Sequence, residues 1–145
     1  MVRVYLINWV KRHYLKNSNV IEFHIYDSDI GSSNENQYKS IVDKVNQRDD
    51  KSRAVLTKKR EIENYIHSSL ISDEFNINLD NITNWDKENI SLFVLNKTSF
   101  DDEKIIKEIL NGKVSKKIRK NHLDELNSFD EISGWFKTIK DLMSS

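Results

Sequence analysis

The chain lacks cysteine and proline, and it has only three glycines among its 145 residues. Without cysteine there is no disulfide framework, no thiolate metal site and no cysteine nucleophile, so any metal must bind to oxygen or imidazole. The sequence contains no Walker loop, dinucleotide fingerprint or serine nucleophile elbow, and three glycines could not build them in the usual way. These nucleotide-binding and hydrolase classes are therefore excluded, and tight turns must rely on asparagine, aspartate and serine.

An excess of either charge is also missing, because 23 Lys and Arg residues balance 23 Asp and Glu residues. This balance excludes a generally basic surface for nucleic acid and leaves only local patches. No apolar run approaches the roughly 18–20 residues that span a bilayer, and residues 1–6 lack the uninterrupted apolar core of a signal peptide. We therefore expect one soluble, cytoplasmic domain over residues 1–145, with no membrane contact.

The apolar pattern of the first half predicts an α/β fold. Apolar side chains recur every three or four residues over 2–15, which indicates an amphipathic helix. The β-branched and aromatic run 20–26 predicts a strand, and a polar loop and a helix over 37–46 follow it. Residues 53–57 predict a second strand, which a right-handed crossover would place parallel to the first.

The rest of the chain is predicted to be mostly helical. Thr57 is the expected N-cap of the first of these helices. Residues 72–89 are expected to be irregular, with one short helix near Trp85. The C-terminal part from about residue 99 should be helical, and the helix that starts at 101 should end at Gly112. The expected helices cover 58–70, 101–111, 114–126 and 129–143.

Two carboxylates, Asp27 and Asp29, follow the first predicted strand. Ligands of open α/β sheets bind at the carboxyl ends of strands, and hard divalent cations take oxygen ligands. The pair therefore predicts a divalent metal site. The alternative is a solvated polar turn or a helix N-cap, because aspartate and serine are ordinary turn residues.

Two further carboxylates, Glu61 and Glu63, follow the second predicted strand. Parallel strands end at one edge of a sheet, so either glutamate could join Asp27 and Asp29 there. On an ideal helix the two glutamates are about 200° apart, so we do not expect both to reach one ion. The alternative is that they only stabilise the positive end of a helix dipole.

A basic run follows Gly112. Lys113 and Lys117 are four residues apart and share a helix face. A lysine beside a metal can neutralise the charge that develops on a phosphoryl group, and its neighbours could follow a nucleic-acid backbone. The alternative is a solvated helix face paired with acidic neighbours. The candidate nucleic-acid-binding residues are Lys116, Lys117 and Lys120.

Three segments, taken in order, resemble the later part of a TOPRIM domain of the OLD-nuclease kind. They are Ile21-Glu22-Phe23-His24-Ile25-Tyr26-Asp27-Ser28-Asp29, the segment 55–66 around Arg60-Glu61-Ile62-Glu63-Asn64-Tyr65, and Gly112-Lys113. The resemblance implies that Asp27 and Asp29 bind Mg²⁺ or Mn²⁺. It also implies that Glu61 or Glu63 supplies a further catalytic carboxylate and that Lys113 supports phosphodiester cleavage.

The resemblance is partial. TOPRIM domains begin with a strand that bears a glutamate, followed by a helix and another strand, whereas only the predicted helix over 2–15 precedes the first strand here. We therefore expect a partial TOPRIM-like parallel sheet flanked by helices. Because two parallel strands leave open edges, the chain is predicted to be half of a split or truncated nuclease, completed by a partner chain or by self-association.

Two functions follow from these expectations. The first is a metal-dependent nuclease module that acts on DNA or RNA beside an ABC-type ATPase in an antiphage system. The second is a non-catalytic accessory or regulatory module that docks on an ATPase or nuclease partner. A third interpretation is a small α/β domain whose carboxylates only form turns and caps.

Overall fold

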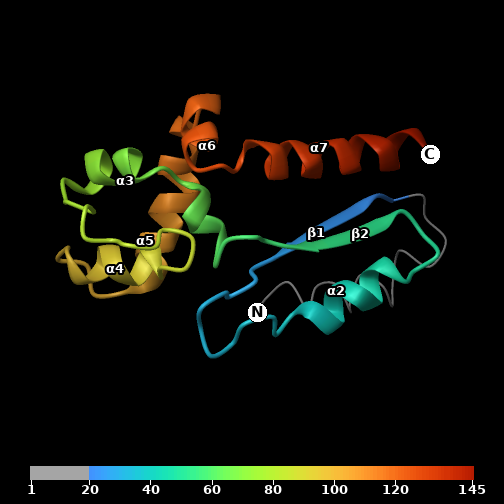
Figure 1. Cartoon of the computed structure of the whole chain (residues 1–145), viewed down its shortest axis with the longest axis horizontal. Coiled ribbons are helices and arrows are strands. Elements are labelled where there is room, and N and C mark those ends of the chain that lie inside the picture. Colours follow the sequence, from blue (N-terminus) through green and yellow to red (C-terminus); the bar gives the residue numbers. More distant parts are fainter. Residues whose placement is uncertain (1–19) are drawn as a thin grey trace.

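The computed structural model describes residues 20–145, so the helix predicted over 2–15 lies outside the described residues. Within this range the architecture is α/β, with a two-stranded parallel sheet, flanking helices and a helical C-terminal region (Figure 1). Strand β1 (Glu22–Tyr26) pairs with β2 (Ser52–Leu56). The expected fold class is confirmed, and the strand bounds differ by one or two residues from those predicted.

Helix α2 (Lys39–Asn46) connects the two strands and packs against one face of the sheet. Val45 of this helix forms a small core with Tyr26 and Ala54. The ring of Tyr38 stacks on Tyr26 with 5.5 Å between the centroids. The helix predicted over 37–46 is confirmed, except that it begins two residues later.

The outer edge of β2 is closed by a side chain. The Nδ2 of Asn46 donates to the carbonyl of Ala54 at 2.9 Å, and its Oδ1 accepts from the backbone N–H of Ala54 at 2.8 Å. These two bonds replace those of a neighbouring strand, and blocked edges of this kind oppose strand addition. A further strand could pair with β2 at Ala54 only by displacing Asn46.

The single helix predicted over 58–70 is wrong. The structure has a short 3-10 helix, η1 (Ile62–Tyr65), and then α3 (Ser68–Phe75), which the side chain of His67 caps. The backbone N–H groups of Lys58 and Lys59 donate to the Tyr65 hydroxyl at 3.1 and 3.3 Å.

Thr57 does not cap a helix at this point either. Its Oγ1 accepts from Ser28 N at 3.0 Å and donates to the carbonyl of Lys59 at 2.7 Å. These contacts hold residues 57–61 in a non-helical conformation, because the backbone groups that a helix would use are bound to tertiary partners.

The helical lobe packs around the larger core. It contains α3, α4 (Ile90–Asn96) and α5 (Glu103–Ile109), and α5 continues as the π-helix η2 (Leu110–Val114) and the 3-10 helix η3 (Ser115–Lys117). Helix α4 has no counterpart among the helices predicted from the sequence. The fully buried side chains of this core include Ile71, Ile90, Val94, Ile106, Leu110 and Val114.

Two boundaries of this lobe differ from the predictions. Asp102 caps α5 by accepting from Lys104 N at 2.8 Å, and the chain stays helical through Gly112. Of residues 72–89, expected to be irregular, 72–75 belong to α3 and 76–89 are irregular, and no helix forms near Trp85. The indole of Trp85 donates instead to the carbonyl of Asn64 at 2.9 Å, which anchors this irregular segment to η1.

The last helices are α6 (Lys120–Glu125) and α7 (Phe129–Ser144). The helix predicted over 114–126 is broken, because Ile118 and Arg119 are extended. The helix predicted over 129–143 is confirmed. Figure 1 shows α7 on the opposite side of the strands from α2. No helix among residues 20–145 is long and apolar enough to cross a membrane.

Glu131 binds α7 to the segment that follows β2. It accepts from the backbone N–H of Lys58 at 2.9 Å and from the Tyr65 hydroxyl at 2.8 Å. The ring of Trp135 also lies against Tyr65, with 5.5 Å between the centroids. Tyr65 therefore joins the segment after β2 to the C-terminal helix.

Candidate carboxylate site

Asp27, Glu61 and Glu63 form a carboxylate cluster at the carboxyl ends of the two parallel strands. Asp27 directly follows β1, and its Oδ1 accepts from the backbone N–H of Ile62 at 3.0 Å. This bond brings the segment after β2 to the end of β1. Burial raises the pKa of Asp27, and the nearby charge of Glu63 raises it further. The structure therefore brings Asp27 together with the segment that carries Glu61 and Glu63.

Both glutamates belong to this cluster. Glu61 has an extended backbone, with φ −138° and ψ 167°, and Asn64 Oδ1 accepts from its N–H at 2.9 Å. The separation of about 200° applies to an ideal α-helix, so it does not hold for this segment. The two residues are 8% and 2% exposed. Burial raises the pKa of Glu61, and the charges of Glu63 and Asp27 add to this effect.

The helical lobe contributes one cation and one amide to the cluster. Lys107 Nζ of α5 lies 3.3 Å from Glu61 Oε1, and Asn111 Nδ2 of η2 donates to Glu63 Oε1 at 2.7 Å. Burial acts to lower the pKa of Lys107, but the charges of Glu63 and Glu61 outweigh it and the pKa is raised. The ammonium therefore keeps its proton beside the carboxylates.

Sequence reasoning missed both Lys107 and Asn111. The available signal was their spacing of four residues on the helix predicted over 101–111, which places two polar side chains on one helix face. That spacing does not say which element the face meets. Only the side-chain contacts of the tertiary structure, Lys107 with Glu61 and Asn111 with Glu63, identify the glutamates as its partners.

Two atoms of the cluster have no partner. Glu61 Oε2 and Glu63 Oε2 are buried and accept no hydrogen bond. A buried carboxylate oxygen without a donor is costly, so it indicates a place for water, a proton or a cation. Carboxylate oxygens are also the ligands that Mg²⁺ and Mn²⁺ prefer. Among residues 20–145, however, no three His, Cys, Asp or Glu side chains are arranged to hold one metal ion.

Asp29 is held differently from Asp27. Its backbone is left-handed, with φ 52°, and its N–H donates to the carbonyl of Arg60 at 2.9 Å. Its Oδ2 accepts from Gln37 Nε2 at 2.6 Å. The charge of Asp29 makes a smaller contribution than that of Glu63 to the raised pKa of Asp27. Asp29 therefore lies near the cluster, with its carboxylate bound to the loop before α2.

Lys113 is not brought to the carboxylate cluster. Its ammonium forms an ion pair with Glu74 of α3, and Lys117 binds the other oxygen of the same carboxylate at 3.0 Å. The two lysines lower the pKa of Glu74 through these hydrogen bonds. The lysine that the fold places beside Glu61 is Lys107.

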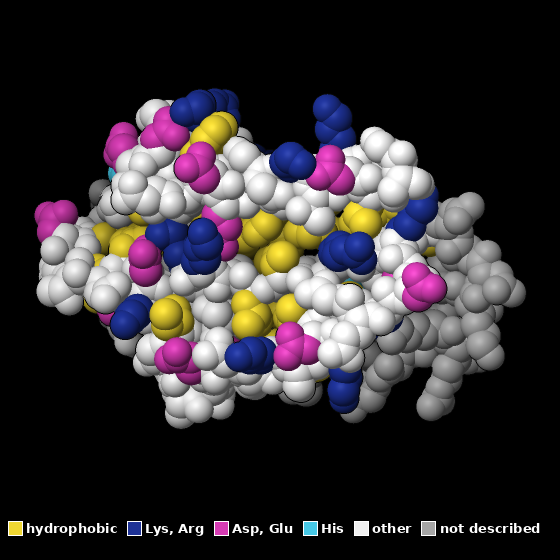
Figure 2. Space-filling view, turned by 45° about the vertical axis from the view of Figure 1, so that its right-hand side comes forward, with side chains coloured by type: hydrophobic (Ala, Val, Ile, Leu, Met, Phe, Trp, Pro, Cys, Tyr) yellow, Lys and Arg dark blue, Asp and Glu magenta, His cyan; other side chains and the backbone are white. Residues whose placement is uncertain are grey.

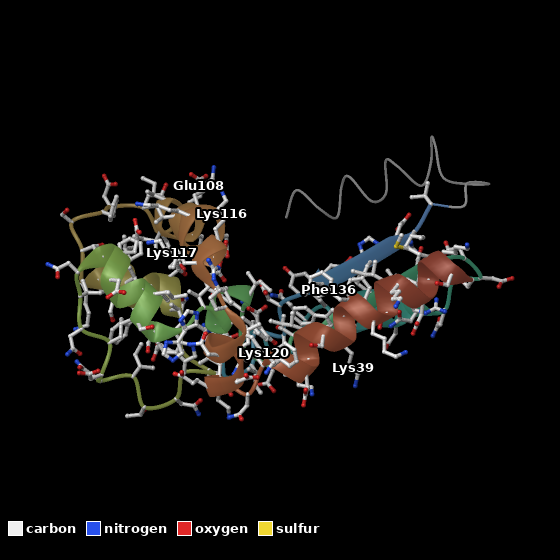
Figure 3. The ribbon with its side chains drawn as sticks, turned by 90° about the horizontal axis from the view of Figure 1, so that it is seen from above. Lys39, Glu108, Lys116, Lys117, Lys120 and Phe136 are labelled. Atoms are coloured by element: carbon white, nitrogen blue, oxygen red, sulfur yellow. The ribbon has the colours of Figure 1, made fainter. Side chains whose placement is uncertain are left out.

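The basic run is divided rather than continuous. Lys120 pairs with Asp124 at 2.6 Å, and its ammonium lies 4.3 Å from the ring centroid of Phe129. Figure 3 shows Lys120 apart from Lys116 and Lys117. On the face drawn in Figure 2, acidic and basic side chains are interspersed. Lys117 and Lys120 are therefore both partly neutralised by carboxylates.

The carboxylate cluster is thus assembled from β1, the segment after β2, α5 and η2. No protein-family model, curated protein or solved structure matches the chain.

Proposed function

We propose that the chain is a TOPRIM-type nuclease module that hydrolyses phosphodiester bonds of DNA or RNA with Mg²⁺ or Mn²⁺. The observation that carries the proposal is the pair of unpartnered buried oxygens, Glu61 Oε2 and Glu63 Oε2, beside Asp27. They lie at the carboxyl ends of two parallel strands, where open α/β sheets bind their ligands. Carboxylates that raise one another's pKa in this way favour a cation that cancels the repulsion between them.

Asp27, Glu61 and Glu63 are the residues that would hold the ion, but they would have to draw together around it, because no three described carboxylates are arranged as a metal site in this structure. The resemblance implies Asp29 as a further ligand, and Asp29 would first have to leave Gln37. When bound, the ion supplies Lewis-acid stabilisation of a phosphoryl oxygen. Asn111 holds Glu63 in place through Oε1, which leaves Oε2 available. Ile62 holds Asp27 in the same way through its backbone N–H.

Lys107 takes in this proposal the role that the resemblance implies for Lys113. Its side chain is 35% exposed, so a bound phosphate can reach the ammonium. A fixed positive charge stabilises the negative charge that develops on a phosphoryl group. Lys113 could act here only after leaving its ion pair with Glu74.

The nucleic-acid backbone would be followed by Lys116, Lys117 and Lys120. Lys117 and Lys120 would then exchange their carboxylate partners, Glu74 and Asp124, for phosphates. Such exposed ion pairs are weak, on the order of 0–1 kcal/mol, and phosphates can displace them. Binding through these residues should therefore weaken as the salt concentration rises.

The second candidate is a non-catalytic accessory or regulatory module that docks on an ATPase or nuclease partner in an antiphage system. The contacts of Lys107 and Asn111 favour it, because each of them occupies one oxygen of a glutamate. The cluster is then partly neutralised within the chain. In this interpretation the carboxylates stabilise the junction between the sheet and the helical lobe.

The test is a titration of Mg²⁺ and Mn²⁺ on the full chain, followed by the melting temperature and by nicking of supercoiled plasmid. We expect the metals to raise the melting temperature and to support nicking, and the Glu61→Gln, Glu63→Gln double variant to lose both effects. Glu74→Gln, which removes an acidic partner of Lys113, is the matched control and should keep both. Absence of nicking in a folded wild-type chain would overturn the nuclease proposal.

A further inference from the structure

Two buried hydroxyl groups lie between the segments that carry the carboxylate cluster. Ser28 separates Asp27 from Asp29, and Thr57 directly follows β2. Their residues are 6% and 2% exposed. Both strands run toward the helical lobe in Figure 1, and the two hydroxyls lie where the chain leaves the strands. Serine and threonine are mostly exposed in proteins, so their burial at this place points to a specific role.

Both hydroxyls donate to the same acceptor, the carbonyl of Lys59. Ser28 Oγ lies 2.8 Å from this oxygen, and Thr57 Oγ1 lies 2.7 Å from it. A carbonyl oxygen has two lone pairs, so the two bonds satisfy it completely. Thr57 Oγ1 also accepts from the backbone N–H of Ser28 at 3.0 Å. The side chains of Ser28 and Thr57, called the hydroxyl pair below, therefore bind the segment after β1 to the segment after β2.

Lys59 is held by its other polar groups as well. It is only 5% exposed, and lysine is rarely buried unless it is paired. Its ammonium forms an ion pair with Asp86 and donates to the carbonyl of Leu126 at 3.0 Å. Its backbone N–H donates to the Tyr65 hydroxyl at 3.3 Å. The acceptor of the hydroxyl pair is therefore a fixed point of the structure, and it lies two residues before Glu61.

The carboxylate that precedes Ser28 binds the same segment. Asp27 Oδ1 accepts from the backbone N–H of Ile62 at 3.0 Å. Ser28 adds two contacts, one through its N–H and one through its hydroxyl. Moving the segment away from the end of β1 would break all of these bonds. Glu61 lies inside the segment, between Lys59 and Ile62, so these bonds limit where its carboxylate can be placed.

We propose that the hydroxyl pair positions the proposed metal site by fixing Glu61 and Glu63 relative to Asp27. Its members are positioning residues, because each hydroxyl is buried and donates its proton within the chain. Groups that orient the ligands of a metal affect its affinity although they do not touch it. The inference rests on the proposed function, because the placement of these carboxylates matters to an ion only if one binds there.

The first experiment measures amide hydrogen exchange in the full chain without metal. The N–H of Ile62 donates to Asp27, so its exchange reports how well the segment after β2 is held at the end of β1. Thr57→Val removes the hydroxyl and keeps the shape of the side chain. We expect it to accelerate this exchange about tenfold relative to the N–H of Ile106 in the core. Thr57→Ser keeps the hydroxyl and should retain the wild-type ratio.

Ser91→Ala is the matched control for this experiment. It removes another buried hydroxyl, which donates to Glu103 Oε1 at 2.6 Å, and it should leave the ratio unchanged. Ser28→Ala removes only one member of the hydroxyl pair, so we expect a smaller acceleration in the same direction. An unchanged ratio in both Thr57→Val and Ser28→Ala overturns the inference, as does an equal acceleration in Ser91→Ala.

The second experiment measures the binding of Mn²⁺ to the full chain by titration calorimetry, without nucleic acid. We expect Thr57→Val to weaken binding about tenfold or more, and Thr57→Ser and Ser91→Ala to bind as the wild type does. Equal binding by the wild type and Thr57→Val overturns this inference and leaves the proposed function standing. A wild type that binds no Mn²⁺ overturns the proposed function, and the role of the hydroxyl pair at a metal site with it.

Discussion

Asn111 donates a hydrogen bond to one oxygen of Glu63 and leaves the other oxygen, also buried, without a donor. One turn earlier, Lys107 Nζ lies 3.3 Å from Glu61 Oε1, and the other oxygen of Glu61, Oε2, is likewise buried without a donor. The helical lobe therefore orients both glutamates through one oxygen each. The remaining two oxygens are available to a ligand, and this arrangement is the basis of the predictions on the site.

The carboxylate cluster makes stability depend on pH in an unusual direction. Burial and neighbouring charges raise the pKa values of Asp27 and Glu61 above their ordinary values of 3.8 and 4.5. Between those values and the raised ones, the folded chain binds more protons than the unfolded chain. The contribution of these two groups to the free energy of unfolding therefore increases as the pH falls through the raised pKa values.

This effect is measured by urea unfolding of the wild type and of Asp27→Asn between pH 7 and pH 4. We expect Asp27→Asn to have the larger free energy of unfolding at pH 7, and we expect its advantage over the wild type to shrink as the pH falls. Glu74 has a lowered pKa and so acts in the opposite direction, which makes Glu74→Gln a control of opposite sign. A difference that does not change with pH would show that the Asp27 carboxylate is not perturbed.

Lys107 and Lys113 are predicted to contribute very differently to cleavage. Replacing Lys107 by Met removes the only ammonium that is within 4.0 Å of Glu61 in the described chain, and we expect a loss of about a hundredfold in rate. Replacing Lys113 by Met removes a partner of Glu74 and should change the rate by less than about threefold. The measurement is plasmid nicking at saturating metal, with melting curves to confirm folding. The reverse order of effects would restore Lys113 as the functional lysine.

Asn46 is predicted to protect the edge of the sheet. In Asn46→Leu, the N–H and carbonyl of Ala54 lose their partners, which should cost about 1–3 kcal/mol of unfolding free energy. We also expect faster aggregation on warming, because an open strand edge pairs with other chains. Urea unfolding and light scattering measure the two effects. Lys44→Ala, an exposed change on the same helix, serves as the reference and should have neither effect.

Tyr65 is predicted to hold α7 in place. Tyr65→Phe removes the hydroxyl that binds Glu131 and the N–H groups of Lys58 and Lys59, at an expected cost of about 1–3 kcal/mol. We expect the substitution to accelerate amide hydrogen exchange in α7 but not in α5, because the core contacts of α5 do not involve this hydroxyl. Tyr38→Phe is the comparison variant. Uniformly faster exchange over both helices would argue against a local role.

The sequence by itself determined the elements whose signal is local. The runs that form β1 and β2 are rich in β-branched and aromatic residues, and a helical pattern lies between them, so their parallel pairing follows from the crossover rule. Helix α7 was predicted because its apolar residues recur at helical spacing over its whole length. The meeting of Asp27 with the segment 61–63 also follows, since parallel strands end at one edge.

Only the tertiary structure decided what depends on partners distant in the sequence. Residues 58–62 have a helical pattern, but Asp27 binds the N–H of Ile62 and Thr57 binds the carbonyl of Lys59, and a helix over these residues would use both groups. Both Lys107 and Lys113 lie after Asp102, and no local pattern tells which of them faces Glu61. The packing of the helical lobe brings Lys107 to Glu61 and Lys113 to Glu74. Such pairings depend on contacts across 39 or more residues of sequence, and local propensity and periodicity carry no information about them.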